Sequence, residues 1–279
     1  KLLRNLQALI GVRYIYHENF KNHATPNVAL MYKPGKFNFR ASYAAGFRTP
    51  TLSELYATDI AKKNDRLTIG NLDLKPEKNN YFSLSAEYVH ERFSVSVNAF
   101  YNNIRDMIDY NTIATGDKAM EQYGHKEVRQ RDNIAEAKVH GINVSANAYL
   151  GAGFNLSGGY THLNTQDVEL EQPIDKSIKN AYNINAQWAH SWKIYRLNIN
   201  LNGRINSKRF SKSYGYAPEY QLWDLNTRHS FNLKSVIIEP GFGMENLFDY
   251  MDDRPYNSNY ATLTPGRSFY ISLSLKFKS

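Results

Sequence analysis

Basic and aromatic residues gather in two segments of the chain, and together they could bind a ligand that is both anionic and aromatic. The first segment holds Tyr110, Tyr123, Lys126 and Arg129, and the second holds Lys208, Arg209, Phe210, Lys212, Tyr214, Tyr216 and Tyr220. Convergent Arg, Lys and Tyr side chains bind such a ligand through charge-assisted hydrogen bonds and stacking. The same residues would attract anionic membrane lipids, so the sequence leaves both interpretations open.

The chain contains eight histidines, which raises the question of metal or haem binding. No two of them have the H-x-x-x-H spacing, and several fall within predicted strands or near short turns. His125 and His162 lie near predicted long loops. We keep His125 as a ligand candidate and expect neither a metal site nor a cofactor.

Catalytic motifs are absent from the sequence. It has no G-x-S-x-G segment, no Walker loop and no H-E-x-x-H segment. No histidine is followed two positions later by the serine that outer-membrane phospholipases carry. Without cysteine, the chain also lacks thiolate metal sites and Cys nucleophiles. We therefore expect a protein that is not an enzyme.

The overall charge is moderately basic, with 34 Lys and Arg against 26 Asp and Glu, or +8, in 279 residues. Because the basic residues spread over many predicted strands and no nucleic-acid motif occurs, we expect no nucleic-acid partner. No segment approaches the roughly 20 apolar residues that a transmembrane helix requires.

The elements that position these side chains are β-strands, because apolar and polar residues alternate with a period of two. Phe93, Val95 and Val97 alternate with Ser94 and Ser96, and segments 81–90, 197–202 and 268–277 follow the same pattern. Such alternation predicts half-buried strands with one apolar and one polar face. Helical periodicity is weak, and only 51–62 could hold a short turn of helix.

The alternation and the turn residues divide the chain into twelve predicted strands. They cover 5–16, 26–33, 37–46, 79–90, 92–112, 131–149, 154–165, 179–190, 193–206, 219–232, 235–247 and 266–277. Short connections fall at 33–36, 90–92, 151–153, 191–192 and 232–234. Long connections fall at 17–25, 47–78, 113–130, 166–178, 207–218 and 248–265.

Three features favour a transmembrane barrel over a soluble β-sandwich. Short turns alternate strictly with long loops, and the polar faces are rich in Asn, Ser and Gln, which suits a wet lumen. Aromatic residues also crowd the strand ends: Tyr88 and Phe93 flank one short turn, and Trp188, Trp192 and Tyr195 surround another. Amphipathic rings settle at the headgroup level of a bilayer. We therefore predict an all-β, antiparallel transmembrane β-barrel.

Several short motifs follow one another over residues 40–277, and in this order they resemble TonB-dependent outer-membrane receptors. The first two are Phe47-Arg48-Thr49-Pro50 and Gly70-Asn71-Leu72-Asp73-Leu74-Lys75-Pro76-Glu77. The third, 99–108, precedes the N-x-x-x-A-x-x-x-G segment that runs from Asn133 to Gly141. The last part holds Glu245-Asn246-Leu247-Phe248-Asp249 and Pro265-Gly266-Arg267-Ser268-Phe269-Tyr270. Members of the family usually end on an aromatic residue, whereas here Lys278 and Ser279 follow Phe277.

The resemblance implies a barrel of about 22 strands that is filled by an N-terminal plug. The twelve predicted strands would then be the last part of this barrel, and the plug domain would be absent from residues 1–279. The intact receptor would lie in the outer membrane of a Gram-negative bacterium, contact its lipid and lipopolysaccharide, and take energy from the TonB complex through the plug. Short turns would face the periplasm and long loops the exterior.

The resemblance also implies a ligand, which would be a scarce nutrient complex bound at the outer loops. A ferric siderophore or another iron complex is our first choice, followed by cobalamin and then haem, since no histidine lies between Pro50 and Asn71. A plain porin and a twelve-stranded outer-membrane enzyme are the alternatives of another class. The ligand candidates in the outer loops are Arg48, Tyr110, Tyr123, His125, Arg129, Lys208, Tyr214 and Tyr216.

Overall fold

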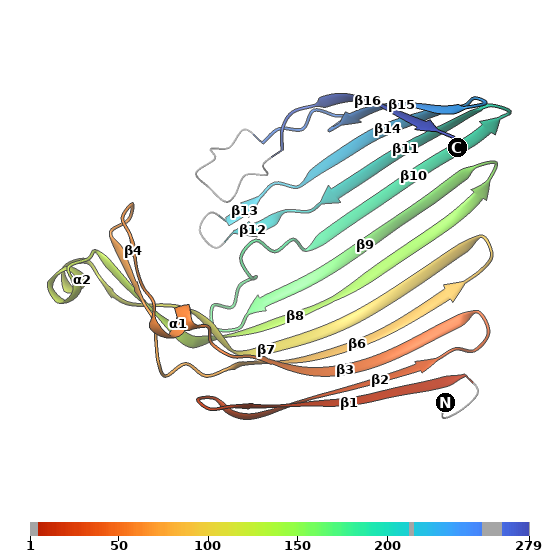
Figure 1. The fold of residues 1–279 in the computed structure, drawn as a ribbon. Helices are drawn as coiled ribbons and strands as arrows, with labels where there is room; N and C mark the ends of the chain where they lie inside the picture. The colour runs from red at the N-terminus through yellow and green to blue at the C-terminus, as the bar shows by residue number, and fades with distance from the viewer. Residues whose placement is uncertain (1–4, 212–214, 253–263, 279) are drawn as a thin grey trace.

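The chain forms one large curved antiparallel sheet. The computed structural model describes residues 5–211, 215–252 and 264–278. Twelve strands follow one another in chain order, each paired with the next. They are β1 (Leu6–His17), β2 (Lys21–Tyr32), β3 (Phe37–Arg48), β6 (Glu77–Val89), β7 (Phe93–Thr115), β8 (Glu127–Gly151), β9 (Phe154–Asp167), β10 (Asn180–Trp192), β11 (Tyr195–Asn206), β14 (Tyr220–Asn232), β15 (Val236–Glu245) and β16 (Ser268–Phe277). Figure 1 shows this sheet curved but open, with β1 and β16 as its two edges.

The predicted number of main strands is confirmed, but several boundaries were wrong. The predicted loop 17–25 is only a turn over residues 18–20, because β2 begins at Lys21, which has φ 64°. Pro26, which the prediction made the first residue of the strand 26–33, lies inside β2. In the structure it pairs with Val12 of β1, whereas the pairing of β2 with β3 begins only at Asn27. A proline without an amide proton is tolerated where one side of a strand lacks a ladder partner.

The two strands β7 and β8 are longer than predicted, which shortens the loop that we placed at 113–130. A short helix, α2 (Gly116–Tyr123), joins them. The turn that we placed at 191–192 lies two residues later, since β10 continues to Trp192 and pairs it with Tyr195. The sequence also gave no sign of two small hairpins, β4 (Thr58–Ala61) with β5 (Arg66–Ile69) and β12 (Arg209–Ser211) with β13 (Gly215–Ala217). The short helix expected within 51–62 is confirmed as α1 (Leu52–Tyr56).

The pairing register joins the alternating residues of all strands into two continuous faces. On one face, called here the apolar face, Val28 pairs with Tyr43, Tyr43 with Phe82, and Phe82 with Tyr101. On the other, the polar face, hydroxyl and amide side chains bond across strands. The bonded pairs include Ser42–Ser83 (2.7 Å), Ser96–Ser145 (2.7 Å) and Asn185–Asn200 (2.6 Å). Cross-strand polar bonds of this kind satisfy the polar face without an apolar core behind it.

The five connections that were predicted to be short all lie at one end of the sheet, called here the turn end. The long connections and the 18–20 turn lie at the other, the loop end (Figure 1). The turn after β8 depends on Gly153, which has φ 87° and whose Cβ would lie 1.9 Å from the Ala189 carbonyl oxygen. Aromatic rings gather at the turn end, as predicted: Tyr88 and Phe93 lie 5.6 Å apart, and Trp192 stacks on Tyr195 at 5.5 Å.

No helix in the described part of the chain has the length and apolarity needed to cross a membrane.

Candidate functional site

At the loop end, segments that are far apart in sequence meet above the middle strands. The β4–β5 hairpin leaves the loop between β3 and β6, and β5 pairs in parallel with the outer part of β8, so that Arg66 lies opposite Glu127. Helix α2 caps the outer extensions of β7 and β8 (Figure 1). These elements position most of the predicted ligand candidates.

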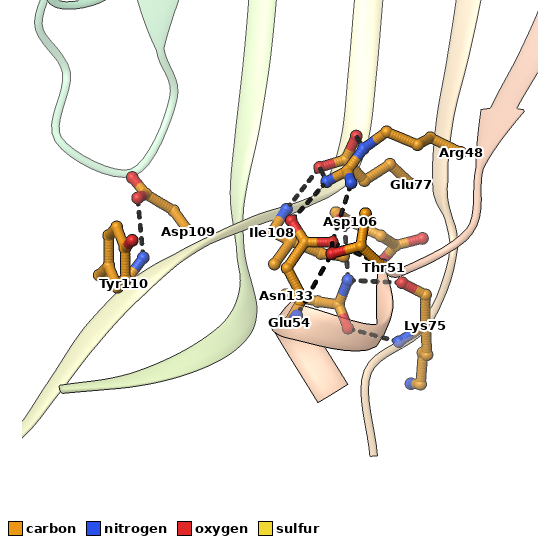
Figure 2. A network of polar contacts seen from close by, with 10 residues as sticks. All are labelled: Arg48, Thr51, Glu54, Lys75, Glu77, Asp106, Ile108, Asp109, Tyr110 and Asn133. Carbon is orange, nitrogen blue, oxygen red and sulfur yellow. Dashed lines mark hydrogen bonds and ion pairs between the residues drawn. The ribbon is translucent and has the colours of Figure 1, made fainter. Parts of the chain in front are cut away.

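Arg48, the last residue of β3, bonds two carboxylates at the base of this assembly (Figure 2). Its Nε and Nη2 donate to Glu77 at 2.7 and 2.6 Å, and its Nη1 and Nη2 donate to Glu54 at 2.9 and 3.1 Å. The Arg48 side chain is 44 % exposed, whereas the carboxylate side chains are only 13 % and 15 % exposed. Glu77 is therefore ion-paired with Arg48. This geometry favours positioning of the loop over ligand contact for Arg48.

The chain turns at this point because local sequence starts a helix there. The buried Pro50 follows β3, and the next residue, Thr51, is the N-cap of α1 in a complete capping box with Glu54. Thr51 Oγ1 accepts from the Glu54 amide, while Glu54 Oε2 accepts from the Thr51 amide. Burial acts to raise the pKa of Glu54, but hydrogen bonds from Arg48 and Thr51 outweigh it and hold the pKa below its usual range. Glu54 is thus held as an anion.

Asn133 ties three backbone segments together beside this ion cluster (Figure 2). Its Oδ1 accepts from the Lys75 amide at 2.7 Å, and its Nδ2 donates to the carbonyl oxygens of Lys75 and Asp106 at 2.9 and 2.6 Å. Asp106 has φ 55° and lies in an irregularity of the β7–β8 pairing. Glu77 Oε1 accepts from the amide just beyond it, that of Ile108. The motif segments around residues 48, 77, 106 and 133 therefore form one unit.

A small apolar core lies beneath this unit. Leu55, Leu74 and Ile108 are each at least nine-tenths buried and pack together. Gly70 lies against α1 so closely that a Cβ would be 2.5 Å from the Leu55 carbonyl oxygen. Asn71 Oδ1 accepts from the Asp73 amide in a tight turn, and Pro76 is buried at the start of β6. The motif residues from Gly70 to Glu77 thus shape the loop.

The C-terminal motif makes a second unit of the same kind. Asn246 is 6 % exposed, has φ 52°, and donates from Nδ2 to the carbonyl oxygens of Tyr250 and Pro265. The Leu247 amide donates to the Trp223 carbonyl, and Phe248 lies edge-on to the Trp223 ring. Asp249 accepts from the amide of Arg267, next to Gly266. These contacts fix the turn after β15 and the start of β16, the strand that contains Phe277.

The first basic and aromatic segment lies on the outer extensions of β7 and β8. The Arg131 guanidinium lies 3.7 Å from the centre of the Tyr110 ring, and its Nη2 donates to the Tyr110 hydroxyl. Arg129, two residues earlier on the same strand, donates to Glu127 at 2.5 Å. Tyr123, in the last turn of α2, is partly exposed. Sequence analysis missed Arg131, although its spacing of two from Arg129 on a strand indicates the same face.

His125 holds the β4–β5 hairpin to this segment. Its Nδ1 lies 2.9 Å from Asp65 Oδ1, and the Lys126 amide donates to the Asp65 carbonyl. The hydrogen bond from His125 holds the pKa of the Asp65 carboxyl below its usual range. His125 therefore fastens the hairpin to the end of α2. No group of three acidic or histidine side chains that could hold a metal ion occurs among the residues that the structure describes.

The second basic and aromatic segment lies apart from the first, since β9 and β10 separate β8 from β11 in the sheet. Lys208 is exposed between β11 and β12. Tyr216 is 55 % exposed and packs edge-on against Phe210 in the β12–β13 hairpin. The predicted Tyr214 lies outside the described residues, as does Lys212. The structure thus brings Tyr110, Tyr123, His125 and Arg129 to one cluster of loops and Lys208 and Tyr216 to another.

Several solved receptor structures share this fold. The ferric enterobactin receptor of Pseudomonas aeruginosa has 20 % sequence identity and a TM-score of 0.77, over 99 % of this chain and 43 % of the receptor. The siderophore receptor PirA of the same organism has 17 % identity and a TM-score of 0.72, over 100 % of this chain and 46 % of PirA. The ferric preacinetobactin receptor BauA of Acinetobacter baumannii has 19 % identity and a TM-score of 0.69, over 98 % and 40 %. The chain spans less than half the length of these receptors.

The family model described as TonB dependent receptor-like, beta-barrel matches residues 1–247. The match covers most of the chain, including the Arg48, Glu77, Asn133 and Asn246 motifs. It confirms the expectation of a receptor rather than an enzyme or a plain porin. The chain therefore belongs to the TonB-dependent receptor family, whose β-barrels lie in the outer membrane of Gram-negative bacteria.

Proposed function

We propose that the protein to which residues 1–279 belong is an outer-membrane active-transport receptor for a ferric siderophore or a similar iron complex. These residues would supply the C-terminal portion of its barrel, and a plug domain outside them would take energy from the TonB complex. The loops at the loop end would face the exterior and bind the ligand. Its barrel would contact the lipid and lipopolysaccharide of the outer membrane of a Gram-negative bacterium.

The observation that carries this proposal is the contact of Arg131 with Tyr110 at the loop end. A guanidinium that is stacked on a phenol ring is held in place, so it loses less freedom when it binds an anionic ligand. Arg129 and Tyr123 add a cation and a ring on neighbouring positions of β8 and α2. This combination suits a chelate that presents negative charge and aromatic rings.

The known ligands of similar receptors support the choice of an iron complex. One solved structure of the Pseudomonas aeruginosa receptor, with 19 % identity to this chain, is a complex with enterobactin. Other receptors that share the fold are named for a siderophore or for ferric preacinetobactin. No bond of the ligand would be made or broken. The ligand would instead bind some loop and plug conformations more tightly than others, and this difference in affinity would commit the receptor to transport.

Uptake and binding by the full-length receptor test the proposal. We would express it in a strain without its own siderophore receptors and measure uptake of radioactive iron that is supplied with a catecholate, a hydroxamate or a mixed siderophore. Uptake that depends on both the receptor and TonB is the expected result. Uptake of cobalamin or haem, with no uptake of any ferric siderophore, would contradict it.

Single substitutions of the loop candidates then test the site. Arg129→Ala, Lys208→Ala and Tyr216→Ala are each expected to weaken binding of the transported complex. Arg48→Ala is included because the sequence alone made Arg48 a ligand candidate. Tyr149→Ala, at an exposed aromatic residue of the turn end, is the control. If none of the four substitutions changes the affinity, the assignment of the ligand to these loops is wrong.

A further inference from the structure

The apolar face carries a shallow hollow across the middle of strands β2, β3, β6 and β7. Its volume is about 520 Å³, and small Ala41 and Ala99 side chains form its floor between larger neighbours. Its walls include Leu30, Tyr43, Phe82, Leu84 and Tyr101. A hollow on a lipid-facing surface is filled by apolar chains of the surrounding bilayer.

Three cations stand beyond this hollow toward the loop end, on the same face of the sheet. Lys78 and Arg105 are direct partners in the β6–β7 pairing. Lys78 lies four residues from Phe82, and Arg105 lies four residues from Tyr101, so each cation shares the face of its aromatic neighbour. Lys138 of β8 pairs with Asn103 in the next row. The hollow and the cations thus form one continuous surface.

These cations lie at the height of the outer headgroups. From Tyr88 at the turn end, Lys78 is ten residues along β6, which is about 25 Å along the membrane normal for a tilted strand. The apolar band of an outer-membrane barrel is also about 25 Å tall. Lys78 therefore falls at the upper boundary of that band rather than within it.

The cations of this surface are only partly paired with carboxylates. The Arg105 side chain is 64 % exposed, and Glu136, at 3.8 Å, is the carboxylate that contacts it. Lys78 is exposed. The cluster thus retains an excess of positive charge.

We propose that Lys78, Arg105 and Lys138 bind the phosphate of a phosphorylated glycolipid of the outer leaflet, with one of its acyl chains in the hollow below. The placement rests on the proposed function only for the orientation, in which the loop end faces the exterior. Charge complementarity selects this occupant, because cations border the apolar hollow on the side where anionic headgroups lie.

Native mass spectrometry of the full-length receptor with added lipid A tests the site. The triple variant Lys78→Gln, Arg105→Gln, Lys138→Gln is compared with the wild type. The control, Lys33→Gln, Lys193→Gln, Lys234→Gln, removes the same charge from exposed positions at the turn end. We expect lipid A to bind the first variant at least tenfold more weakly and the control within twofold of the wild type. Equal binding to both variants, or equal weakening, would overturn the proposal.

Two further measurements distinguish lipid A from free phosphate as the ligand, and failure of this proposal from failure of the transport proposal. Millimolar inorganic phosphate is expected to leave lipid A binding unchanged, and full competition would overturn the lipid assignment. The first triple variant is expected to bind the ferric siderophore normally. Loss of siderophore binding with retained lipid A binding would also overturn the assignment. If the receptor imports no siderophore but its first triple variant still binds lipid A more weakly than the wild type, only the transport proposal is refuted.

Discussion

Arg48 and Glu77 are the last residue of β3 and the first residue of β6, and they are direct partners both in the backbone pairing and through two side-chain hydrogen bonds. The long loop 49–76 therefore begins and ends at one ion pair. Glu54 adds a second carboxylate from within the loop. The pair closes the base of the loop at the point where the sheet leaves the predicted membrane.

Replacement of Arg48 by alanine is expected to loosen this loop. The substitution leaves two largely buried carboxylates without their cation, at a cost of about 1–2 kcal/mol after allowance for the exposure of Arg48. Such a change accelerates proteolysis through local opening by roughly 5- to 30-fold. Limited proteolysis of the full-length receptor, with cleavage mapped to 49–76, measures it. Lys63→Ala, in the exposed β4–β5 turn, is the control, and cleavage at the wild-type rate in Arg48→Ala would contradict the expectation.

The same cluster predicts a pH dependence with a definite sign. The folded-state pKa of Glu54 is lowered, so its contribution to stability is complete above the usual carboxyl pKa of about 4.3. It is lost as the pH falls further, through the lower folded-state value. Hydrogen exchange of peptides from 49–60, corrected for intrinsic rates, should therefore speed up as the pH falls below about 4. Glu54→Gln should weaken this dependence without abolishing it, because Glu77 still pairs with Arg48. Glu121→Gln, at an exposed position of α2, should leave it unchanged.

Asn133 is expected to stabilise the packing of the loop against β7 and β8 more than other asparagines of β8 do. Asn133→Ala removes three hydrogen bonds and leaves backbone groups of Lys75 and Asp106 unpaired, at a cost of about 2 kcal/mol. Exchange of the Lys75 amide should then accelerate about 30-fold. Asn143→Ala, which removes only the bond from Thr161, is the matched control. Equal exchange at Lys75 in both variants would show that Asn133 does not hold the unit together.

Tyr110 offers a graded test of the loop site. Tyr110→Phe keeps the ring beneath Arg131 but removes the hydroxyl, so we expect less than a threefold loss in affinity for the ferric complex. Tyr110→Ala removes the ring as well, and the loss of the cation–π contact should weaken binding about tenfold. Equilibrium fluorescence quenching by the transported complex measures both. The site would be placed elsewhere if the alanine variant bound as tightly as the phenylalanine variant.

The main strands could be predicted because residue alternation is a local property of the sequence. The elements that were missed depend on distant partners. Strand β5 is only four residues long and is held by β8, about sixty positions away. The early start of β2 was missed because a proline is expected at the first residue of a strand, whereas Pro26 lies inside β2, before its pairing with β3 begins.

The site was predicted less completely than the fold for the same reason. The motifs around Arg48 and Glu77 were found, but their mutual contact was not visible in the sequence. Arg131 and Asn133 have their roles because of partners on β7 and in the loop 49–76, which only the folded chain brings near. The ligand role of Arg48 and of the other candidates stays a prediction.

The parallel pairing of β5 with β8 also constrains how the loops can change during evolution. Strand β5 and the outer part of β8 are hydrogen-bonded to each other, and the contact of Asp65 with His125 holds their ends together. A deletion in 58–69 would expose the edge of β8, and a deletion in 116–126 would leave the hairpin without support. Insertions and deletions in these two regions of related receptors should therefore occur together rather than independently.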